Sequence, residues 1–323
     1  MKTKGFAALV CILAALASLS LGAAALSPGA LFDALCAGPG STAGRIFWFV
    51  RLPRTAGCVL AGAALSVAGC VIQNVLANPL ASPNIIGVNA GAGLAVTVCC
   101  AAGALSGWSL AGGAFLGALL AVGLVNLAAR AVGASRTTVI LAGVAVNAFL
   151  GAISDAVTNL LPDAGVLSSD FRVGGFGAVV PQRLIPAGVL ITAALAVVLL
   201  LHNELEVLSL GEDTARSLGL NAGRMRAVFL ALAAVLCGAA VSFAGLLGFV
   251  GLIVPHAVRH LTGNACARLL PLCALWGAAF VTVCDLISRL AFRPQELPVG
   301  ILLSILGGPF FLYILAKRGT KHG

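Results

Sequence analysis

Charged residues inside long apolar segments are the first candidates for chemistry in this chain. Asp155 lies in one such segment, and Asp285 and Arg289 lie four residues apart in another. A carboxylate at membrane depth is costly and tends to face a cavity or a partner charge. Asp155 therefore either lines a pathway or lies at the outer membrane interface. Asp285 and Arg289 are spaced to pair on one helix face, and a structural ion pair is favoured over a proton relay.

Motifs for nucleotide hydrolysis, acyl transfer and metal catalysis are absent from the sequence. All four Lys lie within a few residues of the chain ends, so no G-x-x-x-x-G-K phosphate loop is formed. The patterns H-E-x-x-H and G-x-S-x-G are also missing. His256 and His260 share one helix face, as metal ligands can, but no acidic residue lies nearby in the sequence to complete a site. The pair is expected to mark a helix end near the membrane surface, and no metal site is predicted.

A polar segment over residues 208–226, LSLGEDTARSLGLNAGRMR, interrupts the apolar sequence. Ser209 and Glu212 have the S-x-x-E spacing of a capping box, which predicts a helix start. Asp213 and Arg216 lie three residues apart on that short helix and can pair.

Gly219 is a suitable end for this short helix, because glycine accepts the left-handed conformation that often follows a helix C-terminus. Arg224 and Arg226 then open a long apolar run. A short amphipathic helix held between two spans is either a handle for a soluble partner or a solvated connection.

The composition indicates an integral membrane protein. The chain has 323 residues, of which 60% are hydrophobic and 9% charged, whereas soluble domains carry about 25% charged residues. Apolar runs near the ~20 residues of a membrane-crossing helix recur throughout, and they lack the alternation of a transmembrane barrel strand. The predicted fold is all-α and polytopic, with residues 1–323 forming one transmembrane domain. The ten Cys fall at no metal-binding spacing and are interpreted as small apolar residues.

The apolar runs predict about ten transmembrane helices. They cover approximately residues 6–26, 56–76, 85–105, 110–129, 138–161, 184–201, 227–243, 246–258, 269–290 and 299–315. Residues 162–182 are expected to be a polar excursion, and residues 259–268 a polar connection. The first run follows Lys2 and Lys4 and resembles a signal peptide, but an uncleaved first span is favoured because so many spans follow.

An even number of spans places both termini on one side of the membrane. With the N-terminus in the cytoplasm, cytoplasmic cations outnumber outer ones, as the positive-inside rule requires. The cytoplasmic set is Lys2, Lys4, Arg130, Arg136, Arg216, Arg224, Arg226, Arg259, Arg268, Lys317, Arg318 and Lys321. The outer set is Arg45, Arg51, Arg54, Arg172, Arg183, Arg289 and Arg293. The net charge of +9 is thus attributed to topology rather than to nucleic-acid binding, and segment 208–226 faces the cytoplasm.

Three spans carry small or polar residues at helical spacing on one face. The stripes are Gly62, Ser66, Gly69 and Gln73; Gly143, Asn147, Gly151, Ser154, Asp155 and Thr158; and Gly300, Ser304 and Gly308. Close helix packing in lipid is sufficient reason for all three. The stripe in span 138–161 is more polar than packing needs, and it is the candidate wall of a pathway.

Three arginines share the outer face in this topology. Arg51, Arg54 and Arg293 lie beside the Pro-containing turns RLPR and FRPQELP. Arginine binds carboxylates bidentately, so these residues are candidates for gripping a soluble partner. The alternative is that they are ordinary surface arginines.

Four fragments in order along the chain resemble the membrane subunits of ABC importers for iron–siderophores, haem and cobalamin, the FecCD-type permeases. They are RLPRTAGCVLAGAALSVAGCVIQNVLANPLASPNIIGVNAGAG (51–93), LGEDTARSLGL (210–220), GFVGLIVPHAVRHLTG (248–263) and ELPVGILLSILGGPFFLYIL (296–315). Together with their spacing, they extend the resemblance over nearly the whole chain.

The resemblance implies ten spans per subunit, two such subunits around a central pathway, two cytoplasmic ATP-binding subunits and an extracytoplasmic substrate-binding protein. It implies docking of that protein by Arg51, Arg54 and Arg293, and a pathway lined by the fifth and tenth spans. The implied ATPase-coupling residues are Gly211, Glu212, Asp213, Ala215, Arg216, Leu218 and Gly219. The implied pathway residues are Asn147, Gly151, Ser154, Asp155, Thr158, Arg172 and Ser304.

The sequence FRVGGFGAVV (171–180) departs from the family, which usually has an aromatic residue followed by a Met-Gly-Ser-like turn there. Arg172 is therefore either a ligand contact near the outer mouth or a lipid-headgroup contact.

The resulting prediction is a multi-pass permease subunit of an ABC importer in the cell membrane. Its substrate would be a ferric siderophore, or a haem- or cobalamin-type chelate. A separate subunit would use ATP, and this chain would bind no cofactor and perform no enzymatic reaction. The alternative is an ion-gradient-driven secondary transporter that uses Asp155 and the Asp285–Arg289 pair.

Overall fold

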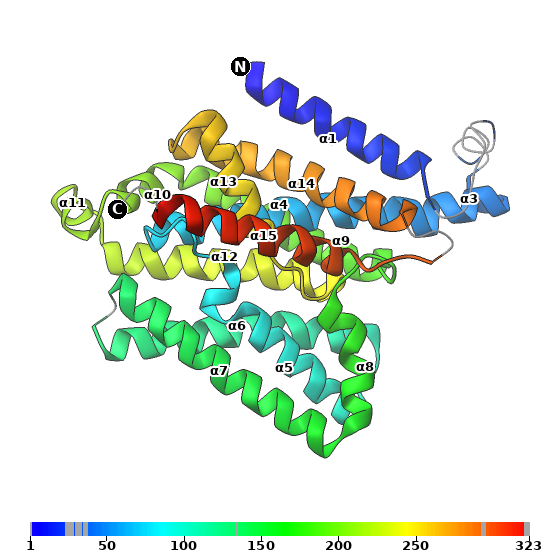
Figure 1. The fold of residues 1–323 in the computed structure, drawn as a ribbon, viewed down its shortest axis with the longest axis horizontal. Coiled ribbons are helices and arrows are strands. Elements are labelled where there is room, and N and C mark those ends of the chain that lie inside the picture. The colour runs from blue at the N-terminus through cyan, green and yellow to red at the C-terminus, as the bar shows by residue number, and fades with distance from the viewer. Residues whose placement is uncertain are drawn as a thin grey trace.

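The described part of the chain is helical. The computed structural model describes residues 2–22, 29, 34, 38–133, 135–291 and 295–319, and these ranges contain helices and connections but no strand (Figure 1). The prediction of an all-α fold is therefore confirmed.

The elements alternate between long helices and short connecting ones. The long helices are α1 (Lys2–Ser20), α4 (Leu52–Val75), α6 (Gly107–Ala131), α7 (Arg136–Leu160), α9 (Pro181–Leu200), α12 (Ala222–Ala244), α14 (Cys266–Leu290) and α15 (Val299–Gly319). The shorter α-helices are α3 (Thr42–Ile46), α5 (Val88–Ala101), α8 (Pro162–Val173), α10 (His202–Ser209), α11 (Glu212–Ser217) and α13 (Val250–Thr262). Two 3₁₀ turns, η1 (Gly38–Gly40) and η3 (Pro83–Ile86), and a π-helical turn, η2 (Phe47–Arg51), complete the described elements.

Seven described segments are long and apolar enough to cross a membrane. They are α1, the continuous run Thr42–Val75 formed by α3, η2 and α4, and helices α6, α7, α9, α12 and α14. The shorter apolar helices are α5 and the part of α15 over Val299–Ile314. Together with α13, these helices take the places of the ten predicted spans.

The two termini point toward one end of the bundle (Figure 1). α1 begins and α15 ends toward the end that carries α10 and α11, while α8 and the start of α9 lie at the opposite end. We call these the α11 end and the α8 end. The shared direction of the two termini agrees with an even number of spans.

Helix α4 is the centre of the packing. Every residue from Ala64 to Val75 is buried, and the helix contacts α12, α13 and α14. Gly62 faces Gly277 of α14, and Gly69 faces Gly251 of α13, so closely that a Cβ on Gly62 or Gly69 would overlap the backbone of the facing helix. The glycine stripe predicted on this span is therefore a packing surface.

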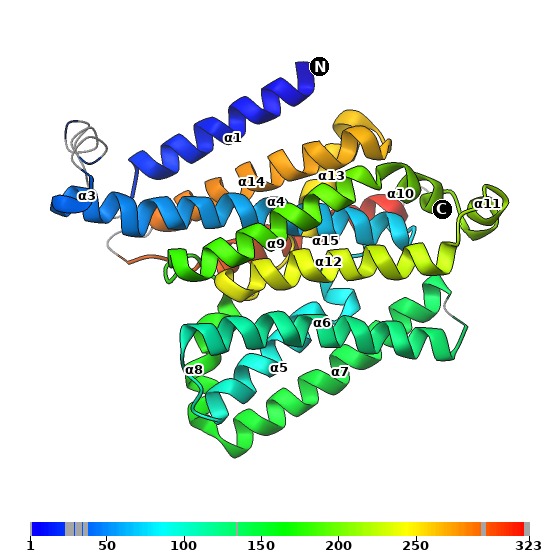
Figure 2. The same ribbon diagram turned by 180° about the vertical axis from the view of Figure 1, so that it is seen from behind.

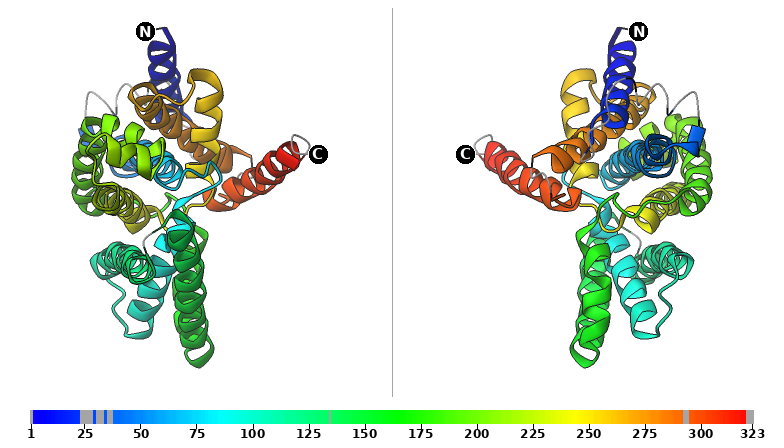
Figure 3. Two further views of the ribbon diagram at one scale, coloured as in Figure 1. Left: turned by 90° about the vertical axis from the view of Figure 1, so that its left-hand side faces the viewer. Right: turned by 90° about the vertical axis from the view of Figure 1, so that its right-hand side faces the viewer.

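The remaining helices extend from this centre in two directions. α5, α6 and α7 form a layer below α12 (Figure 2). Seen along the long axis, α15 projects from the body in a different direction from α7 and α8 (Figure 3). Both projections expose large apolar side chains, including Leu141 and Phe149 of α7, each 64% exposed, and Ile305 of α15, 60% exposed.

The predicted capping box is wrong. Ser209 is the last residue of α10 and its hydroxyl donates to Glu206 O at 2.7 Å, while α11 begins after Gly211 without a side-chain cap. Because α10 continues through Ser209, no helix starts there. The predicted end of the short helix is confirmed: α11 ends at Ser217, and Gly219 has a φ of +82°.

Two stretches expected to be irregular are largely helical. Residues 162–182 contain α8 and the start of α9, and residues 259–268 contain the end of α13 and the start of α14. Their polarity reflects exposure at the ends of the bundle rather than an absence of secondary structure.

Candidate functional site

A wall formed by α5, α7, α8 and α15 brings together most of the predicted pathway residues. Arg172 lies in the last turn of α8, and its Nη2 donates to Ser154 Oγ of α7 at 2.6 Å. Ser154 is 4% exposed, and its Oγ lies 3.4 Å from Thr97 Oγ1 of α5. The three side chains thus connect α5, α7 and α8.

Backbone hydrogen bonds fix the position of Arg172. The amide of Leu246 donates to Phe171 O at 2.9 Å, and the amide of Gly300 donates to Gly174 O at 3.2 Å. These bonds fasten the end of α8 to the connection after α12 and to the first turn of α15. Gly174 has a φ of +76°, which favours glycine. The last turn of α8, which carries Arg172, is therefore fixed beside α12 and α15.

Arg172 lines two neighbouring cavities. One, of about 320 Å³, lies between α5 and α7 and is also lined by Gly151, Ser154 and Asp155. The other, of about 460 Å³, lies against α15 and is also lined by Ser304. The fold thus gathers these five predicted pathway residues from α7, α8 and α15 at one place.

Two other predicted pathway residues do not line these cavities. Asn147 donates from Nδ2 to Asn84 O at 2.6 Å and so supports the connection before α5. Thr158 donates to Asp155 O of its own helix at 3.0 Å. Leu246, in contrast, lines both cavities although the sequence did not indicate it; no local pattern places it against α8.

Helix α11 is anchored on one side and exposed on the other. Ala215 is fully buried, and Glu212 pairs with the buried Arg226 and lies 3.8 Å from Arg216. The predicted pairing of Asp213 with Arg216 is absent among the described ion pairs, because Arg216 is directed toward Glu212. The predicted coupling residues are thus held to α12 through Glu212, while most of the helix faces outward.

A buried charge network lies at the α8 end. Asp285 of α14 is fully buried and accepts hydrogen bonds of 3.0–3.2 Å from Nε and Nη2 of Arg54. Arg289 Nε lies 3.0 Å from Asp285 Oδ2, which confirms the predicted pair. Arg54 Nη1 also contacts Glu296 Oε2 at 2.6 Å. One carboxylate therefore serves two arginines, and a second covers the outer side of Arg54.

Two arginines of this region satisfy the C-terminal carbonyls of α1. Arg51 Nη1 donates to Leu19 O and Ser20 O at 2.8 and 2.7 Å, and Arg289 Nη1 donates to Leu21 O at 3.2 Å. The last carbonyls of a helix lack partners within the helix and attract cations. The guanidinium groups thus attach α1 to α4 and α14.

Two of the predicted docking arginines have partners within the chain. Arg51 and Arg54 are only 3% and 8% exposed, because their donors are engaged with α1, Asp285 and Glu296. In this conformation neither presents a free guanidinium to a soluble partner. Arg293, the third predicted docking residue, lies outside the described residues.

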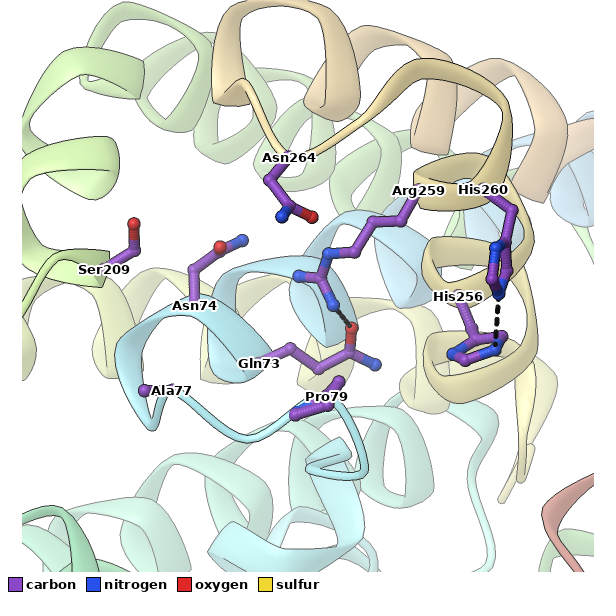
Figure 4. Close-up of a pocket in the computed structure, with 9 residues that line it drawn as sticks. All are labelled: Gln73, Asn74, Ala77, Pro79, Ser209, His256, Arg259, His260 and Asn264. Carbon is purple, nitrogen blue, oxygen red and sulfur yellow. Dashed lines mark hydrogen bonds between the residues drawn. The ribbon is translucent and has the colours of Figure 1, made fainter. Parts of the chain in front are cut away.

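A polar cavity of about 480 Å³ lies at the α11 end, bordered by α4, α10 and α13 (Figure 4). Gln73 connects two of its walls: its Nε2 donates to Gly251 O at 3.1 Å, and its Oε1 accepts from Arg259 Nη1 at 2.6 Å. His256 and His260 of α13 also line the cavity, and none of its nine described lining residues is acidic. No predicted pathway residue reaches it.

Comparison with known proteins extends the resemblance over the whole chain. The model of the FecCD transport family matches residues 10–317. The hemin transport system permease protein HmuU of Yersinia pestis is 34% identical over 99% of this chain and 97% of its own. The Fe(3+)-citrate import system permease protein YfmD of Bacillus subtilis is 36% identical over 94% and 91%. The vitamin B12 import system permease protein BtuC of Shigella sonnei is 37% identical over 95% and 93%.

The fold agrees with these relatives. A solved structure of a transporter assigned to the metal-chelate type of ABC transporters, in an inward-facing conformation, has a TM-score of 0.86 at 26% identity and covers 98% of this chain and 99% of its own. The alternative of an ion-gradient-driven transporter finds no support among these relatives. Sequence and fold therefore agree that the chain is a membrane permease subunit of the ABC importer type, and it belongs to the FecCD transport family.

Proposed function

We propose that this permease moves a ferric siderophore, or a related haem- or cobalamin-type chelate, across the membrane along the wall of α5, α7, α8 and α15. The chelate class is supported by the relatives, which carry hemin, ferric citrate and vitamin B12. The pathway is supported by one observation above all: Arg172 is held by Ser154 between two cavities. A guanidinium in that place suits anionic groups on a chelate, and this favours a ligand contact over a lipid-headgroup contact.

A second permease subunit, either a copy of this chain or a related one, would complete the pathway. The chain supplies only one wall, and both α7 and α15 expose large apolar side chains beside the cavities. Exposed apolar surfaces of this kind mark contacts with lipid or with another membrane subunit. Asp155 and Ser304 would then face the space between the two subunits.

The α11 end would be cytoplasmic and would receive the ATP-binding subunits. The predicted cytoplasmic cations outnumber the outer ones, and the chain lacks the lysine of a phosphate-binding loop, so ATP would be hydrolysed by partner subunits. Leu210 and Leu218, each 63% exposed, flank the short helix. When an ATP-binding subunit displaces α11, buried Ala215 and the Glu212–Arg226 pair would transmit that movement to α12.

The α8 end would receive the extracytoplasmic substrate-binding protein. Glu296, whose side chain is 35% exposed, covers Arg54 from the outside. A carboxylate of the binding protein would therefore reach Arg54 only after Glu296 leaves it. Docking by Arg54 is thus proposed as an exchange of one carboxylate for another.

Replacing Arg172 with Gln should lower the rate of ATP-driven chelate uptake by about tenfold to a hundredfold, because a hydrogen bond to a charged group contributes about 1.5–3 kcal/mol. Glutamine keeps a donor for Ser154 but removes the charge. Uptake of ferric siderophores, haem and cobalamin into proteoliposomes containing the complete importer would be measured, with the amount of permease normalised.

Arg183→Gln is the matched control. Arg183 is also an arginine of the α8 end, although it is half-buried whereas Arg172 is exposed, and its Nη2 donates to Ala178 O at 3.0 Å. It lines neither cavity. Equal losses of uptake in the two variants would remove the support for a specific role of Arg172.

Replacing Leu218 with Glu should release the ATP-binding subunit while leaving the permease folded. The side chain is 63% exposed within this chain, so the change removes little internal packing, and a central interface residue contributes about 2 kcal/mol or more. Co-purification from native membranes should lose the ATPase by at least about tenfold.

Val132→Glu provides the control for this experiment. Val132 is 76% exposed and follows α6 at the same end of the bundle, on another connection. It adds the same charge outside the proposed coupling segment. If ATPase is retained with Leu218→Glu, or lost equally with Val132→Glu, the assignment of α11 as the coupling helix is wrong.

A further inference from the structure

His256 and His260 face each other near the end of α13 (Figure 4). Their Nε2 atoms are 3.3 Å apart, and their ring centroids are 4.9 Å apart with the ring planes at 73°. Because the centroids are farther apart than the nitrogens, the two Nε2 edges are turned toward one another. Two ring nitrogens from separate side chains thus converge within one helix, joined by a hydrogen bond, and both offer lone pairs to an ion once the proton between them is lost.

The separation of the two nitrogens is the one that a tetrahedral metal ion imposes. Imidazole nitrogens lie about 2.0–2.1 Å from zinc, so two of them at the tetrahedral angle are about 3.3–3.4 Å apart. A spacing of four residues also places paired histidines on one helix face in known zinc helices. His256 and His260 therefore need little rearrangement to chelate an ion.

The surroundings allow the coordination shell to be completed by water. No group of three or more His, Cys, Asp or Glu suited to a metal occurs among the described residues, but the pair borders the polar cavity of about 480 Å³. Arg259, the cation on the same stretch of α13, extends to Gln73 on the other side of the cavity (Figure 4). An ion on the histidines would thus have space for solvent ligands, as catalytic and labile zinc sites do.

The pair also contacts α15. The ring of His256 packs edge-on against Phe310, with the centroids 5.7 Å apart. An ion bridging one turn of α13 would fix the imidazole against which Phe310 rests. Occupancy would therefore restrain the middle of α15, a helix whose first turns line one of the two cavities.

We propose that His256 and His260 form a binding site for a divalent first-row transition metal ion, with water as the remaining ligands. Imidazole nitrogen suits zinc, copper, iron and nickel, whereas magnesium and calcium prefer oxygen. The site is separate from the pathway of the chelate and does not depend on which chelate is carried.

Titration of the purified full-length permease with Co²⁺ tests the site, since the visible absorption of Co²⁺ reports its coordination. The protein would carry no polyhistidine tag and would be stripped with a chelator beforehand. Wild-type protein should bind one Co²⁺ per chain, displaced by Zn²⁺ and not by Mg²⁺. Loss of a residue that only supports a metal ligand weakens metal binding by at least about tenfold. His256 and His260 would be ligands themselves, so His256→Gln and His260→Gln should each weaken Co²⁺ binding by at least about tenfold.

His202→Gln is the matched control, because His202 is a partly exposed histidine of α10 that contacts Leu199 O rather than another imidazole. Its binding of Co²⁺ should equal that of the wild type. Absence of a stoichiometric site in the wild type, retention of affinity in His260→Gln, or loss of affinity in His202→Gln would overturn the proposal. His260 is exposed, so His260→Gln should fold and decides the question even if His256→Gln is unstable.

Discussion

Replacing Asp285 with Asn should remove most of the folded permease from the membrane. The carboxylate is fully buried and binds both Arg54 and Arg289. Asparagine has the same shape but no charge, so Arg289 loses its carboxylate partner and Arg54 keeps only Glu296. Removing one member of a buried ion pair costs about 3–5 kcal/mol, a large part of the 5–15 kcal/mol that typically separates folded from unfolded protein.

The measurement is the abundance of the permease in membranes, together with the thermal unfolding midpoint of the purified chain. Glu296→Gln is the control, because it removes a partly exposed carboxylate from the same arginine while Asp285 still holds Arg54. Its effect should be at most about 1 kcal/mol, as for exposed ion pairs. An Asp285→Asn protein that is abundant and stable but fails to transport would contradict the structural role and would favour the proton-relay reading.

Replacing Gly62 with Ala should also destabilise the permease, although alanine is the better helix former. A Cβ at this position would overlap the carbonyl group of Gly277, and a Cβ on Gly277 would overlap that of Gly62. Since the obstacle is backbone rather than a flexible side chain, α4 and α14 have to move apart along the centre of the bundle. Overpacking of this kind costs about 1–3 kcal/mol or more, which exceeds the ~1 kcal/mol gained in helix propensity.

Gly112→Ala makes the same chemical change where space is open. Gly112 lies inside α6, is exposed, and has no atom within 4 Å of a built Cβ. This variant should be as stable as the wild type or more stable by up to about 1 kcal/mol. The two unfolding midpoints should therefore shift in opposite directions. A stable Gly62→Ala protein would show that α4 and α14 can separate without loss.

Local chemistry explains what was correctly predicted about the fold. Apolar runs long enough to cross a bilayer locate most of the long helices within a few residues, because the requirement for about 20 apolar residues acts on each segment separately. The second span is an exception, since its helical run begins at Thr42 rather than near residue 56. Glycine at residue 219 ends α11 for an equally local reason. The predicted capping box at Ser209 failed because a local spacing does not reveal that α10 continues through it.

Part of the candidate site could also be predicted from the types of its residues. The polar face of α7 identified Gly151, Ser154 and Asp155, and the departure from the family pattern identified Arg172. The sequence did not reveal that Arg172 donates to Ser154, or that Leu246 lines both cavities. These contacts depend on how α8 is fastened to α12 and α15, which no single segment encodes.

The contacts of Arg51 and Arg54 were decided only by the tertiary structure. By itself, the sequence determined that this is a polytopic helical permease of a recognisable family, without the lysine of a nucleotide-binding loop, because composition, length and motif order are properties of the chain itself. Packing then brought Arg54 to Asp285 across 231 residues, buried Arg51 against the end of α1, and turned two histidine nitrogens to within 3.3 Å. Such pairings are set by which helices touch, and that is the combined outcome of all their surfaces at once.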